Sequence, residues 1–154
     1  MELIRSISGI RGIIGDNFNA SIATQYAKSF CSIQSNNKPI IISRDTRNQG
    51  HEISEAIKKS IISLGIDIYD IGIAPTPVIQ YLAKQLNTGG GIMITASHNP
   101  EEWNGLKFID SDGCFIDKQK NLNLFSNVDK KKLTYENKIG KNGLIVNKSN
   151  EIGT

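Results

Sequence analysis

A hydroxyl, an imidazole, an amide and an amine stand close together in one segment of this sequence. The segment reads Thr95-Ala96-Ser97-His98-Asn99-Pro100 and is soon followed by Asn104-Gly105-Leu106-Lys107. It comes directly after an apolar run, residues 92–94, that is typical of a core strand. A nucleophile and hydrogen-bond donors at the end of a strand favour chemistry on a charged oxygen group, and phosphate is the first candidate.

Ser97 has two interpretations. Serine is common in turns just before Asn-Pro, so a purely structural role explains this residue alone at least as well as a catalytic one. A Ser-His-Asp triad fits poorly, because neighbouring side chains of an extended backbone point apart and His98 is badly placed to deprotonate Ser97. A serine that carries a phosphoryl group fits better, since four cations in segments predicted to converge can balance a dianion. They are Arg11, Arg44, Arg47 and Lys107.

Lys107 is either a solvated strand lysine or an acid/base group of this site. The Asn104-Gly105 pair before it predicts a turn that folds the chain back over the Ser97 loop. Asp45 stands between Arg44 and Arg47, and two explanations are about equally good for this cluster: a local ion-paired turn, or support of the Ser97 loop.

The elements that would position these residues alternate between strand and helix. The pattern predicts strands over 3–10, 40–42, 66–71, 89–94, 106–109 and 143–146, and helices over 21–33, 52–64, 77–86 and 118–126. Glycines 9, 12 and 15 predict a loop that carries Arg11. Near-continuous apolar strands indicate one α/β domain over 1–154, a three-layer α/β/α sandwich with a mostly parallel mixed sheet.

Parallel strands would bring the candidate residues together. Ligands of open α/β sheets gather at the carboxyl ends of the strands. The Arg11 loop, the loop over 44–47 and the Ser97 loop each follow a predicted strand, so we expect all three at one edge of the sheet.

Composition excludes several classes of protein. The 154 residues carry a formal net charge of only +3, which argues against a nucleic-acid or membrane partner. No stretch approaches the ~20 apolar residues of a membrane span, and the N-terminus lacks a signal-peptide pattern, so we expect a cytoplasmic protein. Cys31 and Cys114 are far apart and read as reduced thiols. The segment 110–113 lacks the glutamate of a calcium loop and predicts a turn.

The motifs resemble domain I of the α-D-phosphohexomutases, the superfamily of phosphoglucomutase, phosphomannomutase and phosphoglucosamine mutase, from about Leu3 to about Ile116. The Ser97 segment with the lysine segment after it is the most specific match. Ser8-Gly9-Ile10-Arg11-Gly12 is similar to the family's N-terminal arginine motif, and Arg44-Asp45-Thr46-Arg47 to its second-strand loop. Two positions depart from the pattern: Ser8 stands where an aspartate is usual, and Ser43 where a glycine is usual.

The resemblance implies a role for each residue. Ser97 would be a phosphoserine that exchanges its phosphoryl group with a hexose phosphate through a sugar bisphosphate, which is also an activator. Lys107 would be the acid/base residue and Arg11 its partner or a phosphate ligand. His98 would be a phosphate-loop contact with a further role in proton transfer, so the catalytic residues would be Ser97, Lys107, His98 and Arg11. One phosphate oxygen on Ser97 would ligate Mg²⁺. The supporting residues would be Thr95, Ala96, Asn99, Pro100, Asn104, Gly105, Arg44, Asp45 and Arg47.

The resemblance also implies missing parts. Members of the family have four domains, and the metal-binding and sugar-binding loops belong to domains II–IV. We therefore expect domain I of a phosphohexomutase that partners these domains and is nearly inactive by itself. The alternative is a non-catalytic anion-binding or interaction module of the same fold, against which the presence of both Ser97 and Lys107 argues.

Overall fold

The structure is a computed structural model that describes residues 2–34, 37–47, 49–131 and 140–152. In chain order, its elements are β1 (Ile4–Ser6), β2 (Gly9–Ile13), α1 (Ala20–Gln34), β3 (Ile40–Arg44), α2 (Gly50–Ser63), β4 (Ile68–Ile73), α3 (Thr76–Gln85), β5 (Gly91–Ile94), β6 (Trp103–Ile109), α4 (Lys118–Asp129), β7 (Ile145–Asn147) and a 3₁₀ turn (Ser149–Glu151). Strands and helices alternate from β2 to α4 with one hairpin-like interruption at β5–β6, as the sequence pattern predicts.

One mixed sheet forms the middle layer. Its strand order is β1-β2-β6-β5-β3-β4-β7. β3 pairs in parallel with β4 and β5, and β4 with β7, whereas β6 is antiparallel to both of its neighbours and β1 to β2. Of the described strands, β2, β3, β4, β5 and β7 therefore run in one direction and β1 and β6 in the other. The expected α/β sandwich with a mostly parallel mixed sheet is confirmed.

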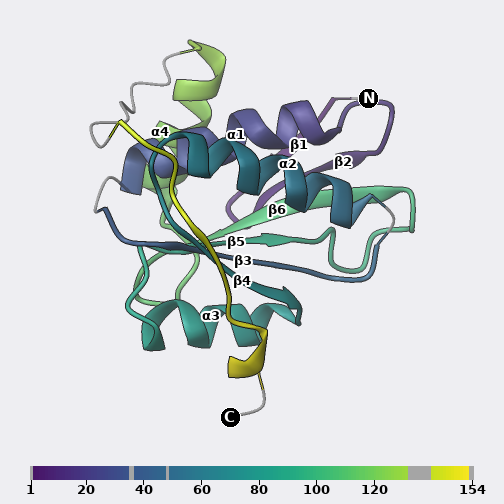
Figure 1. Cartoon of the computed structure of the whole chain (residues 1–154). Coiled ribbons are helices and arrows are strands. Elements are labelled where there is room, and N and C mark those ends of the chain that lie inside the picture. Colours follow the sequence, from purple (N-terminus) through teal and green to yellow (C-terminus); the bar gives the residue numbers. More distant parts are fainter. Residues whose placement is uncertain (1, 35–36, 48, 132–139, 153–154) are drawn as a thin grey trace.

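Helices cover the two faces of the sheet unequally (Figure 1). Helices α1, α2 and α4 lie on one face, where the larger core includes the stacked rings of Phe30 and Phe108, with centroids 5.3 Å apart. Helix α3 lies on the other face and packs on β3 and β5. A smaller core there joins Ile79 and Leu82 of α3 to Met93 of β5 and Ile109 at the end of β6. Most of β6, together with β2 and β1, extends beyond α3 on that face.

The N-terminal segment corrects one prediction. The sequence pattern predicts a single strand over 3–10 and then a loop with Arg11, but the chain forms a β1–β2 hairpin and Arg11 lies inside β2. Gly9, with φ of +125°, explains the reversal, because other residues rarely adopt this conformation. A Cβ on Gly9 would also lie 2.0 Å from the carbonyl oxygen of Leu106, so β6 can approach only a glycine here.

A second correction concerns Asn104 and Gly105, which are predicted to form a turn but belong to β6. Gly105 pairs with Arg11 of β2, and a Cβ there would lie 2.2 Å from the carbonyl oxygen of Ile10. Its missing side chain therefore serves close strand packing. The chain reverses earlier, where Trp103 N–H donates to the carbonyl oxygen of Pro100.

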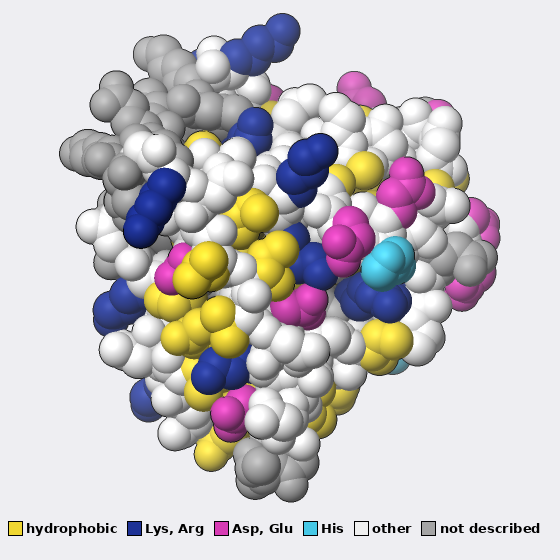
Figure 2. Space-filling model, viewed as in Figure 1, with side chains coloured by type: hydrophobic (Ala, Val, Ile, Leu, Met, Phe, Trp, Pro, Cys, Tyr) yellow, Lys and Arg dark blue, Asp and Glu magenta, His cyan; other side chains and the backbone are white. Residues whose placement is uncertain are grey.

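The remaining elements lie within a few residues of their predicted positions. Helix α4 begins at Lys118 as expected, and the Asp117 carboxylate caps it by accepting from the Lys120 N–H at 2.8 Å. The last predicted strand is present as β7, and hydrophobic side chains gather over it on the face shown in Figure 2, where Leu144, Ile145 and Val146 are exposed. In the described residues no helix is long and apolar enough to cross a membrane.

Candidate functional site

The serine loop, residues 95–102, connects β5 to β6 at the carboxyl end of β5. Thr95 and Ala96 are buried, whereas Ser97, His98 and Pro100 are exposed. Ser97 has φ of +55°, the left-handed conformation that is uncommon for residues other than glycine. Such a conformation persists where surrounding contacts enforce it. It also occurs at Asn37, Gln49, Asn87 and Lys131, so at Ser97 the contacts of the loop matter more than the angle itself.

Arg47 supplies much of that enforcement. Its side chain is only 10% exposed, and its guanidinium donates to four backbone carbonyl oxygens of the loop and the start of β6. The acceptors are the carbonyls of Ser97, Asn99 at 2.7 Å, Pro100 at 2.8 Å and Trp103 at 3.2 Å. A planar group with several fixed donors can hold a curved backbone in this way, and a lysine cannot.

Asp45 links the loop after β3 to the start of the serine loop. Its carboxylate accepts from the Thr95 hydroxyl and lies 3.4 Å from Arg47 Nε. The Thr95 hydroxyl oxygen in turn accepts from the Ser97 N–H at 2.9 Å. Both explanations of the 44–47 cluster therefore hold for this pair: Asp45 and Arg47 are ion-paired with each other, and together they support the serine loop.

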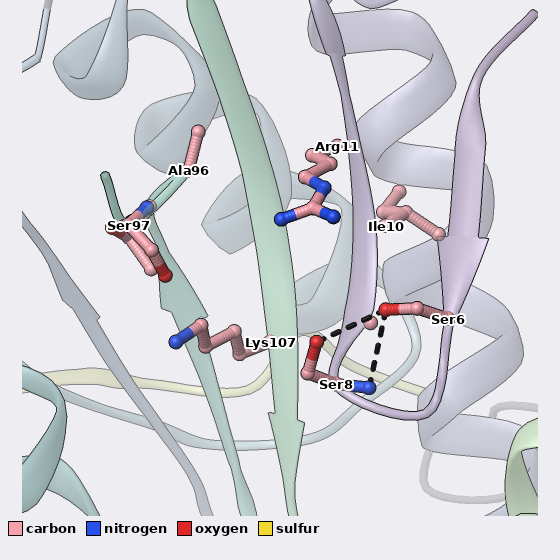
Figure 3. A pocket seen from close by; sticks show the side chains of 9 residues that line it. Ser6, Ser8, Ile10, Arg11, Ala96, Ser97 and Lys107 are labelled. Atoms are coloured by element: carbon pink, nitrogen blue, oxygen red, sulfur yellow. Dashed lines mark hydrogen bonds between the residues drawn. The ribbon is translucent and has the colours of Figure 1, made fainter. Parts of the chain in front are cut away.

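A small cleft lies between the serine loop and the β1–β2 hairpin (Figure 3). Its lining consists of Ser6, Ser8, Gly9, Ile10, Arg11, Thr95, Ala96, Ser97 and Lys107. Figure 3 shows Lys107 extending toward Ser97, with the Arg11 guanidinium facing the same space. The cleft is small, with a volume of about 20 Å³, and cannot enclose a whole sugar.

Arg11 reaches the cleft from β2. Ile10 packs into the larger core, so the next side chain along the strand points to the opposite face, beyond α3. Its Nη1 donates to the Asn99 side-chain oxygen at 3.3 Å. In the described part of the chain, its Nε is buried without a hydrogen-bond partner. A buried N–H of a cation without an acceptor is costly, and an anion in the cleft would remove that cost.

Lys107 lies on the same face of the sheet, because Leu106 and Phe108 on either side of it belong to the larger core. Its ammonium nitrogen is 5.7 Å from the ring centroid of Phe115. No carboxylate is among the residues that line the cleft. Two cations without an acidic neighbour in the lining make the cleft suitable for an anion.

Contacts of Asp110 with Lys120 and Gln34 hold the turn that leads to Phe115. The Asp110 carboxylate accepts from Lys120 at 2.7 Å and from Gln34 at 3.0 Å. Burial raises the pKa of Asp110, but these hydrogen bonds outweigh it and the pKa is lowered overall. The segment 110–113 is thus a structural turn, as the sequence predicts, and the Asp110–Lys120 ion pair orders the residues that lead to Phe115.

Some candidates do not meet at the cleft. The Arg44 guanidinium donates to the carbonyl oxygen of Asp45 at 3.3 Å and lies beside Gly50 at the start of α2, away from the serine loop. His98 is exposed and does not line the cleft. Asn104 is fully buried and its side-chain oxygen accepts from the Gly105 N–H at 2.9 Å, so both residues of this pair shape β6.

Two residues of the site, Ser6 and Phe115, were not singled out by their sequence pattern, and Ser8 was noted only as a departure from the family pattern. Ser6 and Ser8 line the cleft from the hairpin, and Phe115 lies under Lys107. Ser6 and Ser8 are two residues apart, a spacing that suggests a shared face only once the hairpin is recognised. Phe115 follows a turn, and no local pattern connects it with Lys107.

Comparison with known proteins then decides the family. Residues 3–134 match the family model described as phosphoglucomutase/phosphomannomutase, alpha/beta/alpha domain I. The chain belongs to this family. It is 37% identical over 112 residues to the phosphoglucosamine/phosphogalactosamine mutase of Sulfurisphaera tokodaii, a match that covers 73% of this chain and 25% of the relative. It is 42% identical over 116 residues to the phosphoglucosamine mutase of Gloeothece citriformis, with 71% and 23% covered.

Solved structures agree with this assignment of the phosphohexomutase chain. A crystal structure of a phosphoglucomutase/phosphomannomutase family protein from Burkholderia thailandensis has a TM-score of 0.77 at 26% identity and covers 94% of this chain and 33% of its own. Parafusin of Paramecium, a phosphoglucomutase, shares the fold with a TM-score of 0.70 at 19% identity, with 82% and 25% covered. The chain thus spans about a quarter of the length of the curated relatives it matches.

Proposed function

We propose that Ser97 is the phosphoryl carrier of a phosphohexomutase and that this chain forms the domain that presents it. One observation carries the proposal: the serine loop holds an exposed Ser97 in a left-handed conformation at the rim of a cleft that also holds Arg11 and Lys107. The relatives supply the class of substrate, a hexose phosphate such as glucose, mannose or glucosamine phosphate.

Ser97 and Lys107 have different roles in the transfer: Ser97 carries the phosphoryl group, and Lys107 transfers protons. When a hexose 1,6-bisphosphate donates, a bond forms between Ser97 Oγ and phosphorus as the bond from phosphorus to the sugar oxygen breaks. The hydroxyl proton leaves Ser97 and a proton goes to the released sugar oxygen. Lys107 is the group we assign to proton transfer, because its amino group extends toward Ser97 in the same cleft. In the complementary step, phosphorylated Ser97 donates to the free hydroxyl at the other end of a hexose monophosphate: the bond from phosphorus to Ser97 Oγ breaks, a bond to that sugar oxygen forms, and the sugar hydroxyl proton is removed while Ser97 regains one.

Arg11 and the loop geometry stabilise the charge. Phosphoryl transfer depends on positioning and on balancing negative charge at the phosphoryl oxygens. The buried, unpartnered Nε of Arg11 is a donor prepared for such an oxygen. Arg47 acts at a distance by holding the loop carbonyls, so we assign it a positioning role.

A magnesium site is only partly provided. Mg²⁺ prefers carboxylate and phosphate oxygens. The residues described bring together no group of three or more His, Cys, Asp or Glu side chains, and the cleft lining has no carboxylate. The described residues by themselves therefore do not fit the ion. A phosphate oxygen on Ser97 would be one ligand, and the other ligands, like the surfaces that bind the sugar, would come from domains II–IV.

Intact-protein mass spectrometry tests the carrier role. The chain is incubated with glucose 1,6-bisphosphate, and we expect the mass of one phosphoryl group to be added. Ser97→Ala should abolish the addition, while Ser111→Ala, a serine in an exposed turn, should leave it unchanged. A phosphorylated Ser97→Ala variant, or no phosphorylation of the wild type, would contradict the proposal and leave the anion-binding module as the better account.

A second measurement tests the division of labour between domains. We expect the 154-residue chain to turn over glucose 1-phosphate at a negligible rate, since the cleft is too small to enclose a sugar. Multiple turnovers at rates typical of enzymes would show that this chain contains a complete site.

A further inference from the structure

The β1–β2 hairpin brings two hydroxyl groups to the cleft. Ser6 is the last residue of β1 and pairs with Gly9 of β2, while Ser8 lies in the turn between them. Their Oγ atoms are 3.0 Å apart, and the Ser8 N–H donates to Ser6 Oγ at 3.3 Å (Figure 3). Both residues line the cleft with Arg11, Ser97 and Lys107.

One of the two hydroxyl protons of this pair is not used in the hydrogen bond between them. Each hydroxyl has one proton, and the hydrogen bond between the two uses only one of them. If Ser8 donates, Ser6 Oγ accepts two bonds and its own proton is available. If Ser6 donates, the proton of Ser8 is available. Neither hydroxyl has another hydrogen-bond partner in the residues that the structure describes. In both arrangements one hydroxyl donor remains for an acceptor in the cleft.

The other donors of the cleft narrow the choice of that acceptor. The Nε of Arg11 is buried without a partner, and the ammonium group of Lys107 adds a second cation. The lining contains no carboxylate that would compete for these donors. Donors arriving from β1–β2, β2 and β6 suit a small oxyanion with several acceptor oxygens, and a phosphate group is such an anion.

Gly9 allows the β1–β2 hairpin to lie close against β6. Its Cβ would lie 2.0 Å from the carbonyl oxygen of Leu106 and 3.1 Å from Lys107 Cα, so the hairpin lies directly on the strand that carries Lys107. The close contact sets the distance between the hydroxyl pair and the lysine. The hairpin is thereby fixed to the cleft, and its hydroxyl groups are preorganised with it.

We propose that the Ser6–Ser8 pair is a phosphate-binding element, which donates a hydrogen bond to an oxygen of the phosphoryl group that enters the cleft next to Ser97. The identity of that group as the one transferred rests on the proposed function. The binding of a phosphate ion by the pair does not, and it can be measured separately. Because the hydroxyls are neutral, their contribution differs from that of Arg11 and Lys107 in its response to salt.

A titration with inorganic phosphate tests the pair. Amide resonances of the chain are followed by NMR, and we expect those of Ser8, Gly9 and Ser97 to shift together. The double variant Ser6→Ala/Ser8→Ala should bind phosphate about tenfold more weakly, a loss of about 1.4 kcal/mol. This factor should be nearly the same at low and high salt, whereas the loss caused by Lys107→Gln should shrink as salt is added. Ser111→Ala is the matched control and should bind as the wild type does.

The single variants Ser6→Ala and Ser8→Ala serve if the double variant does not fold, since each retains one hydroxyl and should lose part of the affinity. An unchanged affinity in folded variants, or a wild type whose Ser8 and Gly9 amides do not respond to phosphate, overturns the proposal. Phosphorylation of Ser97 by glucose 1,6-bisphosphate is measured separately, and it distinguishes a failure of the carrier function from a failure of the binding element. If Ser97 is never phosphorylated while phosphate binding depends on Ser6 and Ser8, the carrier function fails and the binding element stands.

Discussion

The α3 side of the sheet contains two regions that differ although they share strands. Under α3, Ile41, Met93 and Ile109 are buried against the helix. Beyond α3, the same face carries the hydroxyls and cations of the cleft. Met93 of β5 and Lys107 of β6 are direct partners across the two strands, yet Met93 is 1% exposed and belongs to the core while Lys107 lines the cleft.

The difference shows that one face of the sheet has a region that stabilises the fold and another region that offers groups for chemistry. The covered region gains free energy from apolar burial, about 25 cal/mol for each Å² removed from water. The open region keeps polar donors unsatisfied by other side chains, which costs stability and leaves them available for an anion. Substitutions in the two regions should therefore affect unfolding and phosphoryl chemistry in opposite proportions.

Ile79→Ala tests the covered region. Ile79 is fully buried between α3 and the sheet, and removing a buried isoleucine side chain to Cβ should lower the free energy of unfolding by about 2–5 kcal/mol. Urea denaturation measures the change. Tyr81→Ala on the same helix is the control, because Tyr81 is 61% exposed and its loss should cost less than about 1 kcal/mol. Equal losses for the two variants would mean that α3 does not form this core.

Gly105→Ala tests the boundary between the regions. The new methyl group would lie 2.2 Å from the carbonyl oxygen of Ile10 and push β2 away from β6, so we expect a loss of about 1–3 kcal/mol and a displaced Arg11. Gly50→Ala is the matched control, since its Cβ would have no neighbour closer than 3.7 Å. Thermal unfolding and phosphate affinity measured on both variants check the result. A Gly105→Ala variant as stable as Gly50→Ala would refute the close packing of β2 on β6.

Arg47→Lys tests the support of the serine loop. A lysine can replace only part of the four carbonyl contacts, so the free energy of unfolding should fall by about 1 kcal/mol. The sharper measurement is hydrogen exchange, which should accelerate in residues 97–103 and stay unchanged in β3. Uniform acceleration over the whole chain would show a global effect and would argue against a local support role.

Lys107→Gln tests the open region itself. Its side chain is half-buried and its described contact is the ring of Phe115, so the stability should change by less than about 0.5 kcal/mol. The rate at which glucose 1,6-bisphosphate phosphorylates Ser97 should fall by about 10²-fold or more, as expected for a lost acid/base group. Rapid quench with mass detection follows the reaction. A large loss of stability with an unchanged rate would reverse the roles assigned to the two regions.

Sequence patterns predicted much of this molecule for definite reasons. The isoleucine-rich runs of β3 and β5 and the apolar stripes of α1 and α2 have the periods of buried strands and amphipathic helices. The sequence left open whether the cluster over 44–47 is a local ion-paired turn or a support of the serine loop, and in the structure Arg47 donates to carbonyl oxygens of that loop. Arg44 is close to Arg47 in the sequence but is the last residue of β3, on the face of Ile40 and Ile42, so its side chain lies beside Gly50 of α2.

The hairpin and the start of β6 mark the limit of local inference. Gly9 and Gly105 read as loop and turn residues, since glycine is most often found there. Both are instead needed where strands from distant parts of the chain approach more closely than a Cβ allows. That requirement exists only in the folded state, so the position of Arg11 inside β2 and the place of Ser6 and Ser8 at the cleft could not be predicted from neighbouring residues.

The sequence by itself determined the elements, their alternation and the chemical groups available: a serine, three arginines and a lysine in segments typical of an anion site. These follow from local propensity and hydrophobic period, which depend on residues near in the chain. Only the tertiary structure decided which groups meet. Strand register placed Lys107 beside Ser97 and left Arg44 outside, and the end of α3 left part of the sheet face open. Register and coverage arise from contacts between distant segments, so they belong to the fold as a whole.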